Sequence, residues 1–366
     1  MTTVAVRRHP LVRIILGLAA LVVGVAALLV LGWLLLVFLI VPPVEVVTVA
    51  TLVVSGLIVA GVAAVVVRSN RTAALSRRDK LTLGLMVGIP TAVLTIFILV
   101  PTVASLTLSL TSWNGIGGLD KIQFIGLQNY VDLHQVYKPF YPALSHNLIW
   151  LLFFLFIATP LGMFFAVLLD KNIRGTRVYQ SALYMPVVLS LAIVGFIWML
   201  IYAPEQGLLN NILGTNKQGN LISWLGDPNL NLWAVLVAAS WRHIGYVMVL
   251  YLAGLKAFDP TLREAAAIDG ANERQTFFRV VFPVLKPINI VVIVITVIES
   301  LRAFDLAFVV NKGLNGLELL STMVTNNIIG ETSRIGFGSA IAVVLLLLAV
   351  VPILIYLSRA LREDNA

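Results

Sequence analysis

The stretch that decides the fold is DPTLREAAAIDGANERQTFFRVVFPVLKP, which runs from Asp259 to Pro287. It is a long polar segment between two apolar stretches, in a chain with 60% hydrophobic and only 11% charged residues. A soluble domain carries about 25% charged residues. The composition therefore indicates a polytopic membrane protein, and within it this segment is expected to be an exposed loop.

Eight stretches hold enough apolar residues to span a bilayer, which takes about 20. The sequence therefore predicts an all-α membrane protein with eight transmembrane helices. The first stretch follows a basic N-terminus but is too long for the apolar region of a signal peptide, about 7–15 residues, so we expect an uncleaved span. The predicted spans are Ile14–Val41, Val46–Val67, Leu83–Leu106, Leu148–Leu169, Ser181–Tyr202, Leu232–Leu255, Ile288–Leu306 and Phe337–Leu357.

Lysine and arginine set the expected orientation. With both termini in the cytoplasm, each inner segment is basic in turn, and the outer loops keep only Lys121, Lys138, Lys217, Lys312 and Arg334. This agrees with the positive-inside rule. It divides the chain into an accessory two-span hairpin (1–75) and a six-span core (76–366), with the 259–287 loop on the cytoplasmic side.

Charge and motifs exclude several function classes. The net charge of +8 fits basic cytoplasmic loops, so no nucleic acid is expected as a partner. The chain has no cysteine, and its four histidines are scattered, so no metal site is expected. It has no G-x-x-x-x-G-K-[ST] phosphate loop and no hydrolase motif. We therefore expect no enzyme and no cofactor in this chain, and any nucleotide must be bound by a partner.

The polar loop predicts two short helices. Asp259 is a helix N-cap and Pro260 a first helical residue, so a helix is expected to Ile268. Asp269-Gly270 is a turn signal, after which a second helix is expected over Asn272–Val281. On composition alone, a surface that docks another protein and an ordinary solvated loop remain equally open.

The motif EAAAIDGANERQTFFRVVFPVLKP resembles the EAA loop of permease subunits of bacterial ABC importers. FIGLQNY (124–130), the 184–210 segment, WRHIGYVMVLYLAGL (241–255), RAFDLAF (302–308) and GFGSAIAV (336–343) resemble other segments of carbohydrate-type permeases. The resemblance covers about residues 81–360 and is closest to MalF-like subunits, including alpha-glucoside and trehalose systems. The matching loop residues are Glu264, Ala265, Ala266, Asp269, Gly270, Ala271, Phe278 and Pro283.

The resemblance implies a type I ABC importer core in the bacterial cytoplasmic membrane. It implies a MalG-like second permease subunit, a pair of MalK-like ATPases that bind ATP and Mg, and an extracytoplasmic sugar-binding protein. The loop would couple to an ATPase, with Glu264 pairing with a basic residue there and Gly270 permitting the turn. The substrate would be a sugar, such as the disaccharides trehalose or maltose, carried by alternating access.

Polar and aromatic residues in or beside the predicted spans are candidates for the substrate pathway. Intramembrane charges are rare and usually functional, and a sugar site needs aromatic faces as well as hydrogen-bonding groups. Glu299 and Arg302 have the i,i+3 spacing that lets them pair on one helix face, whereas Arg242 has no partner in its own helix. The alternatives are charges that only satisfy one another and aromatic residues that anchor the helix at the membrane interface. The candidates are Asn147, Ser190, Trp198, Trp241, Arg242, Tyr246, Glu299, Arg302 and Phe304.

Three other functions stay open at this point. An ABC permease for a non-sugar solute would share the coupling loop but not the carbohydrate-type segments. A secondary transporter would need an inverted repeat and a series of intramembrane acids, and only Glu299 lies deep in a span. A membrane scaffold or enzyme subunit would leave the loop unexplained.

Overall fold

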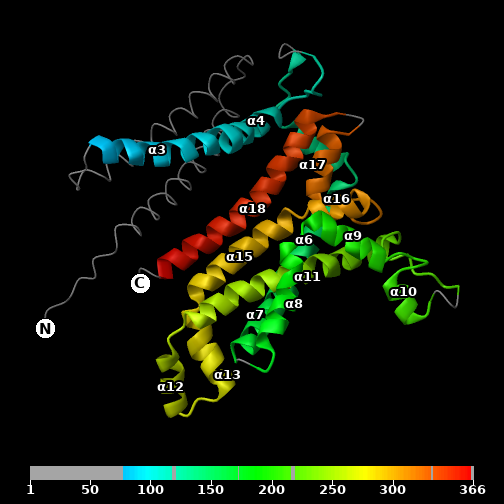
Figure 1. Cartoon of the computed structure of the whole chain (residues 1–366). Helices are drawn as coiled ribbons and strands as arrows, with labels where there is room; N and C mark the ends of the chain where they lie inside the picture. Colours follow the sequence, from blue (N-terminus) through cyan, green and yellow to red (C-terminus); the bar gives the residue numbers. More distant parts are fainter. Residues whose placement is uncertain (1–76, 118–120, 172, 216–218, 331–332, 364–366) are drawn as a thin grey trace. The chain divides into compact units, whose positions relative to one another are not determined.

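The computed structural model describes residues 77–117, 121–171, 173–215, 219–330 and 333–363, and within them the chain forms two compact units (Figure 1). The first unit comprises the described residues up to Asp132 together with Asn327–Val343. The second comprises Leu133–Asn326 and the end of the chain from Val344. The predicted spans Ile14–Val41 and Val46–Val67, and with them the 1–75 hairpin, lie outside the described residues.

In the first unit, α3 (Arg77–Leu94), a π-helix η2 (Thr95–Leu99) and α4 (Val100–Leu108) run on from one another, and α18 (Ile335–Glu363) begins here. The loop after α4 is held by α5 (Gln128–Gln135). The Asn129 side chain donates to the backbone oxygens of Ser109 and Thr111, both at 2.8 Å. This buried amide satisfies backbone groups left free where α4 ends.

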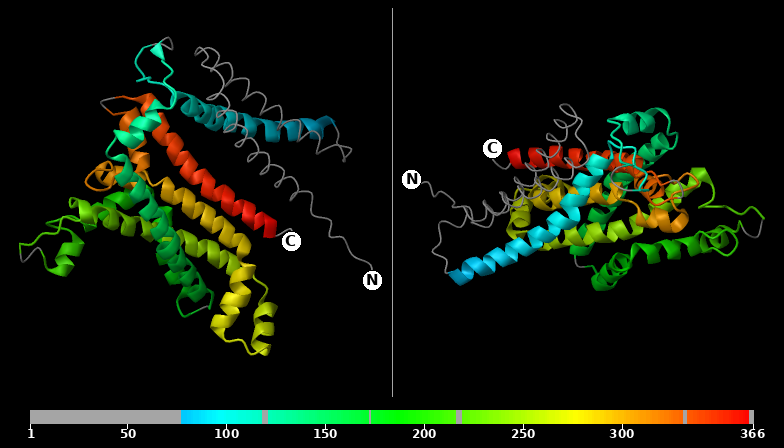
Figure 2. Two further views of the ribbon diagram at one scale, coloured as in Figure 1. Left: turned by 180° about the vertical axis from the view of Figure 1, so that it is seen from behind. Right: turned by 90° about the horizontal axis from the view of Figure 1, so that it is seen from above.

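The second unit is a bundle built around one long central helix, α11, which Figures 1 and 2 show crossing its middle. Gly162 of α7 lies so close to α11 that an added Cβ would come within 2.8 Å of Val247, so the small residue allows the two helices to pack tightly. Its helices are α6 (Phe140–Phe153), η4 (Phe154–Ala158), α7 (Thr159–Asp170), α8 (Thr176–Val188), α9 (Leu191–Ile201), α10 (Leu208–Leu213), α11 (Pro228–Lys256), α12 (Pro260–Ile268), α13 (Glu273–Thr276), η5 (Phe277–Val281), α14 (Phe282–Val284), α15 (Lys286–Leu301), α16 (Asp305–Asn311) and α17 (Leu320–Ile328).

In the described part of the chain, each of the three π-helices ends two residues before a proline: Pro101, Pro160 and Pro283. Proline has no N–H to donate, and its ring clashes with the carbonyl four residues earlier. A wider turn relieves that clash without ending the helix. Pro101 and Pro160 therefore lie within continuous helical segments that accommodate them through π-turns.

Four of the predicted spans are confirmed as single helices long and apolar enough to cross a membrane: Leu85–Leu108, Phe140–Asp170, Pro228–Lys256 and Ile335–Tyr356. Two further predicted spans are bent pairs, so the described part of the chain has up to six crossings if each pair counts as one.

The predicted span Ser181–Tyr202 is a bent pair, in which α8 and α9 meet at 105°. Ser190 is extended at the bend, and its hydroxyl accepts a hydrogen bond from the Ile193 amide, which starts α9 as a new helix.

The predicted span Ile288–Leu306 lies within the second segment of the other bent pair, Lys286–Asn311. Its helix α15 ends at Leu301, and the chain restarts as α16 at Asp305. At the other end of α15, Leu285 separates it from Glu273–Val284, Pro287 lies in its first turn, and the two segments are bent by 75°.

Candidate functional site

The loop 259–287 folds into a helical elbow, as its sequence predicts. The Asp259 carboxylate accepts the Thr261 backbone N–H at 2.9 Å and the Thr261 hydroxyl at 2.8 Å. These hydrogen bonds lower the pKa of Asp259 below its usual value, because they favour the ionised carboxylate. Pro260 occupies the first turn of α12, where a missing N–H has no cost.

The turn of the elbow requires glycine. Gly270 has φ +76°, a left-handed conformation that side chains disfavour. The Gly270 amide donates to Ala267 at 3.1 Å, and the Ala271 amide donates to Ala266 at 3.0 Å. These two bonds form a Schellman motif that satisfies the last carbonyls of α12.

The second half of the elbow starts with a capping box. The Asn272 side chain accepts the Gln275 amide and the Gln275 side chain accepts the Asn272 amide, both at 2.9 Å. The predicted second helix over Asn272–Val281 is present as α13 followed by the π-helix η5. Local hydrogen bonds therefore fix the start of α12, the turn at Gly270 and the start of α13.

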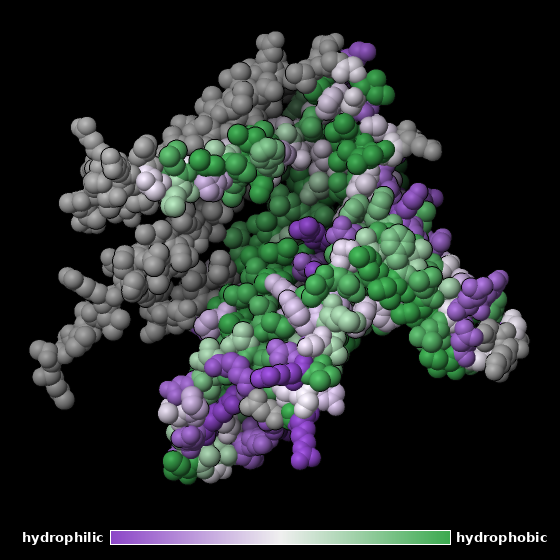
Figure 3. All heavy atoms as spheres, viewed as in Figure 1, coloured by the Kyte–Doolittle hydropathy of each residue, from purple (hydrophilic) through white to green (hydrophobic). Residues whose placement is uncertain are grey.

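The elbow exposes a mixed face. Glu264, Ala265 and Ile268 are exposed on α12, whereas Ala266 is buried. Ile268 is 87% exposed and Phe278 57%, a large apolar exposure beside charged residues. The remaining motif residues Asp269, Gly270 and Pro283 are exposed and Ala271 is half-buried. Hydrophilic residues gather over this end of the unit in Figure 3.

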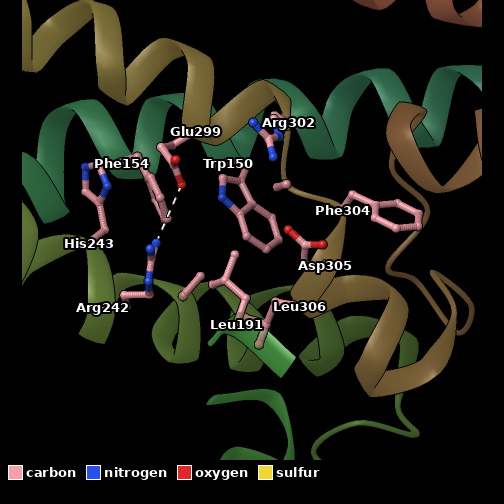
Figure 4. A pocket seen from close by; sticks show the side chains of 12 residues that line it. Trp150, Phe154, Leu191, Arg242, His243, Glu299, Arg302, Phe304, Asp305 and Leu306 are labelled. Carbon is pink, nitrogen blue, oxygen red and sulfur yellow. Dashed lines mark ion pairs between the residues drawn. The ribbon is translucent and has the colours of Figure 1, made fainter. Parts of the chain in front are cut away.

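A cavity of about 180 Å³ lies among the helices of the second unit (Figure 4). Residues of α6, η4, α9, α11, α15 and α16 and of the α15–α16 connection line it. The lining residues are Trp150, Phe154, Leu191, Ala239, Arg242, His243, Glu299, Arg302, Ala303, Phe304, Asp305 and Leu306.

The cavity contains a charge pair between two helices. Arg242 of α11 lies 3.8 Å from the Glu299 carboxylate of α15, and the two point toward one another in Figure 4. The predicted pairing of Glu299 with Arg302 is wrong. Arg242 has no partner in its own helix, as its sequence predicts, and finds one on α15. Arg302 caps the end of α15 and leaves the helical path, so the i,i+3 spacing no longer applies.

Two donors at the cavity have no hydrogen-bond partner: the indole Nε1 of Trp150 and Nε of Arg242. Trp150 is only 1% exposed. Buried polar groups are nearly always hydrogen-bonded, so such donors indicate a site that takes an acceptor. His243 is stacked 4.4 Å from Phe154 and lies 3.4 Å from the hydroxyls of Thr159 and Thr296.

Of the predicted pathway residues, the structure brings Arg242, Glu299, Arg302 and Phe304 together at the cavity. The other five lie elsewhere. Asn147 is buried and accepts the Leu320 amide, and Ser190 caps α9. Trp198 and Trp241 pack edge to face at 6.0 Å in the adjoining core, and Tyr246 is half-buried one turn beyond the cavity on α11.

Sequence reasoning missed Trp150, Phe154, Leu191 and Asp305 as lining residues. The first three lie in apolar runs and carry no local signal, while Asp305 directly follows the predicted pathway residue Phe304. Among the described residues, no three metal-ligating side chains come together.

Apolar helices of membrane-spanning length, a polar cavity between them and an exposed helical elbow define a membrane permease. Over residues 158–363 the chain matches the family described as binding-protein-dependent transport system inner membrane component, and it belongs to that family. It is therefore a multi-pass permease subunit of the ABC transporter class, which decides against the secondary-transporter and scaffold hypotheses.

Among its relatives, the xylose/arabinose import permease protein XacH of Haloferax volcanii is 31% identical over 72% of this chain and 82% of that protein. The trehalose/maltose transport system permease protein MalF of Thermococcus litoralis is 28% identical over 79% of this chain and 97% of that protein. The fold is similar to a crystal structure of a bacterial ABC transporter involved in the import of the acidic polysaccharide alginate. That match has a TM-score of 0.66 at 22% identity and covers 78% of this chain and 96% of that chain.

Proposed function

We propose that this chain is a permease subunit of an ATP-driven sugar importer in the cytoplasmic membrane. It would form half of the translocation pathway with a second permease subunit, and its elbow would dock in a cytoplasmic ATPase. The relatives named for sugar transport support the substrate class, and the exposed elbow supports the coupling. The single observation that carries the proposal is the elbow, whose caps shape a surface that the described residues leave exposed.

Docking through the elbow has a simple physical basis. Glu264 is exposed, and no described residue of this chain forms an ion pair with it. Ile268 follows it by one turn on the same face, so a partner could bury an apolar side chain and pair a carboxylate at one contact. Closure of the ATPases would then move the elbow and switch the helices between inward- and outward-facing states.

The cavity supports a neutral sugar as the substrate. It contains two basic side chains, Arg242 and Arg302, and two acidic ones, Glu299 and Asp305, so its formal charges balance. The free donors of Trp150 and Arg242 could bind hydroxyl oxygens, while Phe304 offers an aromatic face. The cavity has a volume of about 180 Å³, whereas common ligand sites have volumes of about 300–1,000 Å³. The second permease subunit would therefore complete the site.

The test is reconstitution of the importer in proteoliposomes, with the second permease, ATPase and binding protein encoded beside this gene. ATP hydrolysis and uptake are measured with neutral pentoses, trehalose and maltose, and with an alginate oligosaccharide, an amino acid and an oligopeptide as matched non-neutral or non-sugar solutes. We expect stimulation by a neutral sugar, and a disaccharide if the trehalose and maltose resemblance holds. Stimulation only by the amino acid or peptide would mean a permease for another solute.

A further inference from the structure

A nearly buried carboxylate joins the elbow to the membrane helices. Asp170 is the last residue of α7, and its side chain is only 9% exposed. One carboxylate oxygen lies 3.1 Å from Lys256 Nζ, at the end of α11, and the other lies 2.9 Å from the Arg263 guanidinium of α12. Lys256 also donates to the Asp170 backbone oxygen at 3.3 Å. One side chain thus connects the ends of three helices.

The surroundings make this connection stiff. The Arg263 guanidinium lies over the Phe258 ring at 5.2 Å, and Phe258 is buried in a hydrophobic cluster with Leu169 and Leu255. The Asp170 carboxylate is nearly buried, whereas the Lys256 and Arg263 side chains are 50% and 40% exposed, so solvent screens the two ion pairs only in part. Loss of the Asp170 charge would leave two cations at one point without their shared anion.

Arg263 and Glu264 are neighbours in sequence but have opposite roles on α12. Successive helical residues point about 100° apart, so one turns inward and the other outward. Arg263 pairs with Asp170, and Ala266 three residues later is buried on the same side. Glu264 is exposed on the docking face. The helix is therefore anchored on the side opposite the face that a partner would contact.

We propose that Asp170 is a positioning residue that fixes the elbow to α7 and α11, so that a push on the elbow moves the transmembrane helices instead of bending the loop. The inference rests on the proposed coupling function. Without the anchor, elbow movement is absorbed locally, and ATP is hydrolysed without the matching movement of sugar.

The test measures sugar molecules transported per ATP hydrolysed in the reconstituted full importer, using a sugar that stimulates the wild type. Asp170→Asn has nearly the same shape without the charge, and we expect it to assemble, to keep basal ATP hydrolysis and to lower this ratio at least threefold. Arg263→Gln should lower the ratio similarly, and Arg263→Lys, which keeps the charge, should restore most of it. The double variant should be no worse than Asp170→Asn alone, because that single variant already removes the pair with Arg263.

Lys171→Ala is the matched control. Lys171 is adjacent to Asp170 and pairs with Glu273 of α13 at 2.7 Å, but both side chains are largely exposed. Exposed ion pairs contribute little to stability, so the ratio of sugar transported to ATP hydrolysed should change less than twofold. A loss of assembled complex or thermal stability with an unchanged ratio in Asp170→Asn would mean that Asp170 is only structural, and would overturn the proposal. If wild type itself shows no sugar-stimulated hydrolysis, the proposed function fails instead.

Discussion

The elbow and the cavity both depend on charged and polar side chains, but these side chains find their partners differently in the two regions. In the elbow, Asp259, Gly270 and Asn272 are satisfied by neighbours within five residues in sequence. In the cavity, Arg242 finds Glu299 on a distant helix at 3.8 Å, and donors of Trp150 and Arg242 stay unpaired. A part whose shape is fixed in advance suits docking, whereas a part with unpaired donors suits a ligand that comes and goes.

The largest effect is expected at the turn of the elbow. Gly270→Pro forces φ to about −65° where the chain needs +76°, and it removes the amide that donates to Ala267. We expect insertion in the membrane to be retained and sugar-stimulated ATP hydrolysis to be lost. Gly270→Asn is the matched control, because asparagine tolerates the left-handed conformation, and it should keep most of the activity. Equal activity of the two variants would show that the turn geometry does not matter.

The next effect is expected in the cavity. Arg242→Gln removes the partner of Glu299 and leaves a carboxylate uncompensated among the spans. We expect sugar uptake to fall about tenfold, equivalent to about 1.4 kcal/mol, while the ratio of sugar to ATP is kept. The double variant Arg242→Gln, Glu299→Gln should fold better than the single one, which a thermal unfolding measurement checks. If uptake is normal in the single variant, the cavity is not on the pathway.

A smaller effect is expected from the capping box. Asn272→Ala removes the acceptor for the Gln275 amide and should destabilise α13 by about 1 kcal/mol. Hydrogen exchange of residues 273–276 should then be faster, with exchange in α11 unchanged. Exchange that is unaltered over 273–276 would mean that the surrounding contacts, and not the cap, hold this helix.

The smallest effect concerns the exposed pair of Lys171 and Glu273. The hydrogen bond from Lys171, together with its charge, lowers the pKa of Glu273 below its usual value. A lowered pKa stabilises the folded state above the usual glutamate pKa, and this contribution is lost as the pH falls through the lowered value. Titration of Glu273 by NMR should show the pKa rising in Lys171→Ala. An identical pKa in both proteins would mean that the pair is not formed.

The same contrast explains what the sequence could predict. The caps, the turn glycine and the four confirmed single-helix spans follow from local patterns. The helix starts at Asp259 and Asn272 could therefore be placed by residue. The bend at Ser190 could not, because the apolar run continues through it, and the end of α15 at Leu301 has no proline or glycine to mark it. The pairing of Arg242 with Glu299 joins residues 57 apart in sequence, and no helical period predicts it.

For the same reason, only some of the residues that line the cavity could be predicted from the sequence. Charged residues are rare within membrane spans, so Arg242, Glu299 and Arg302 could be identified as lining residues from the sequence. Trp150 is one aromatic residue among many in an apolar run, and only its packed position with an unpaired donor sets it apart.

The central claim is that the elbow couples this permease to an ATPase through Glu264. The most direct measurement compares sugar-stimulated ATP hydrolysis of the reconstituted importer between wild type, Glu264→Lys and Glu264→Gln. We expect sugar-stimulated ATP hydrolysis to be almost completely lost in Glu264→Lys and partly lost in Glu264→Gln, with normal membrane insertion of both. Wild-type coupling in Glu264→Lys would contradict it.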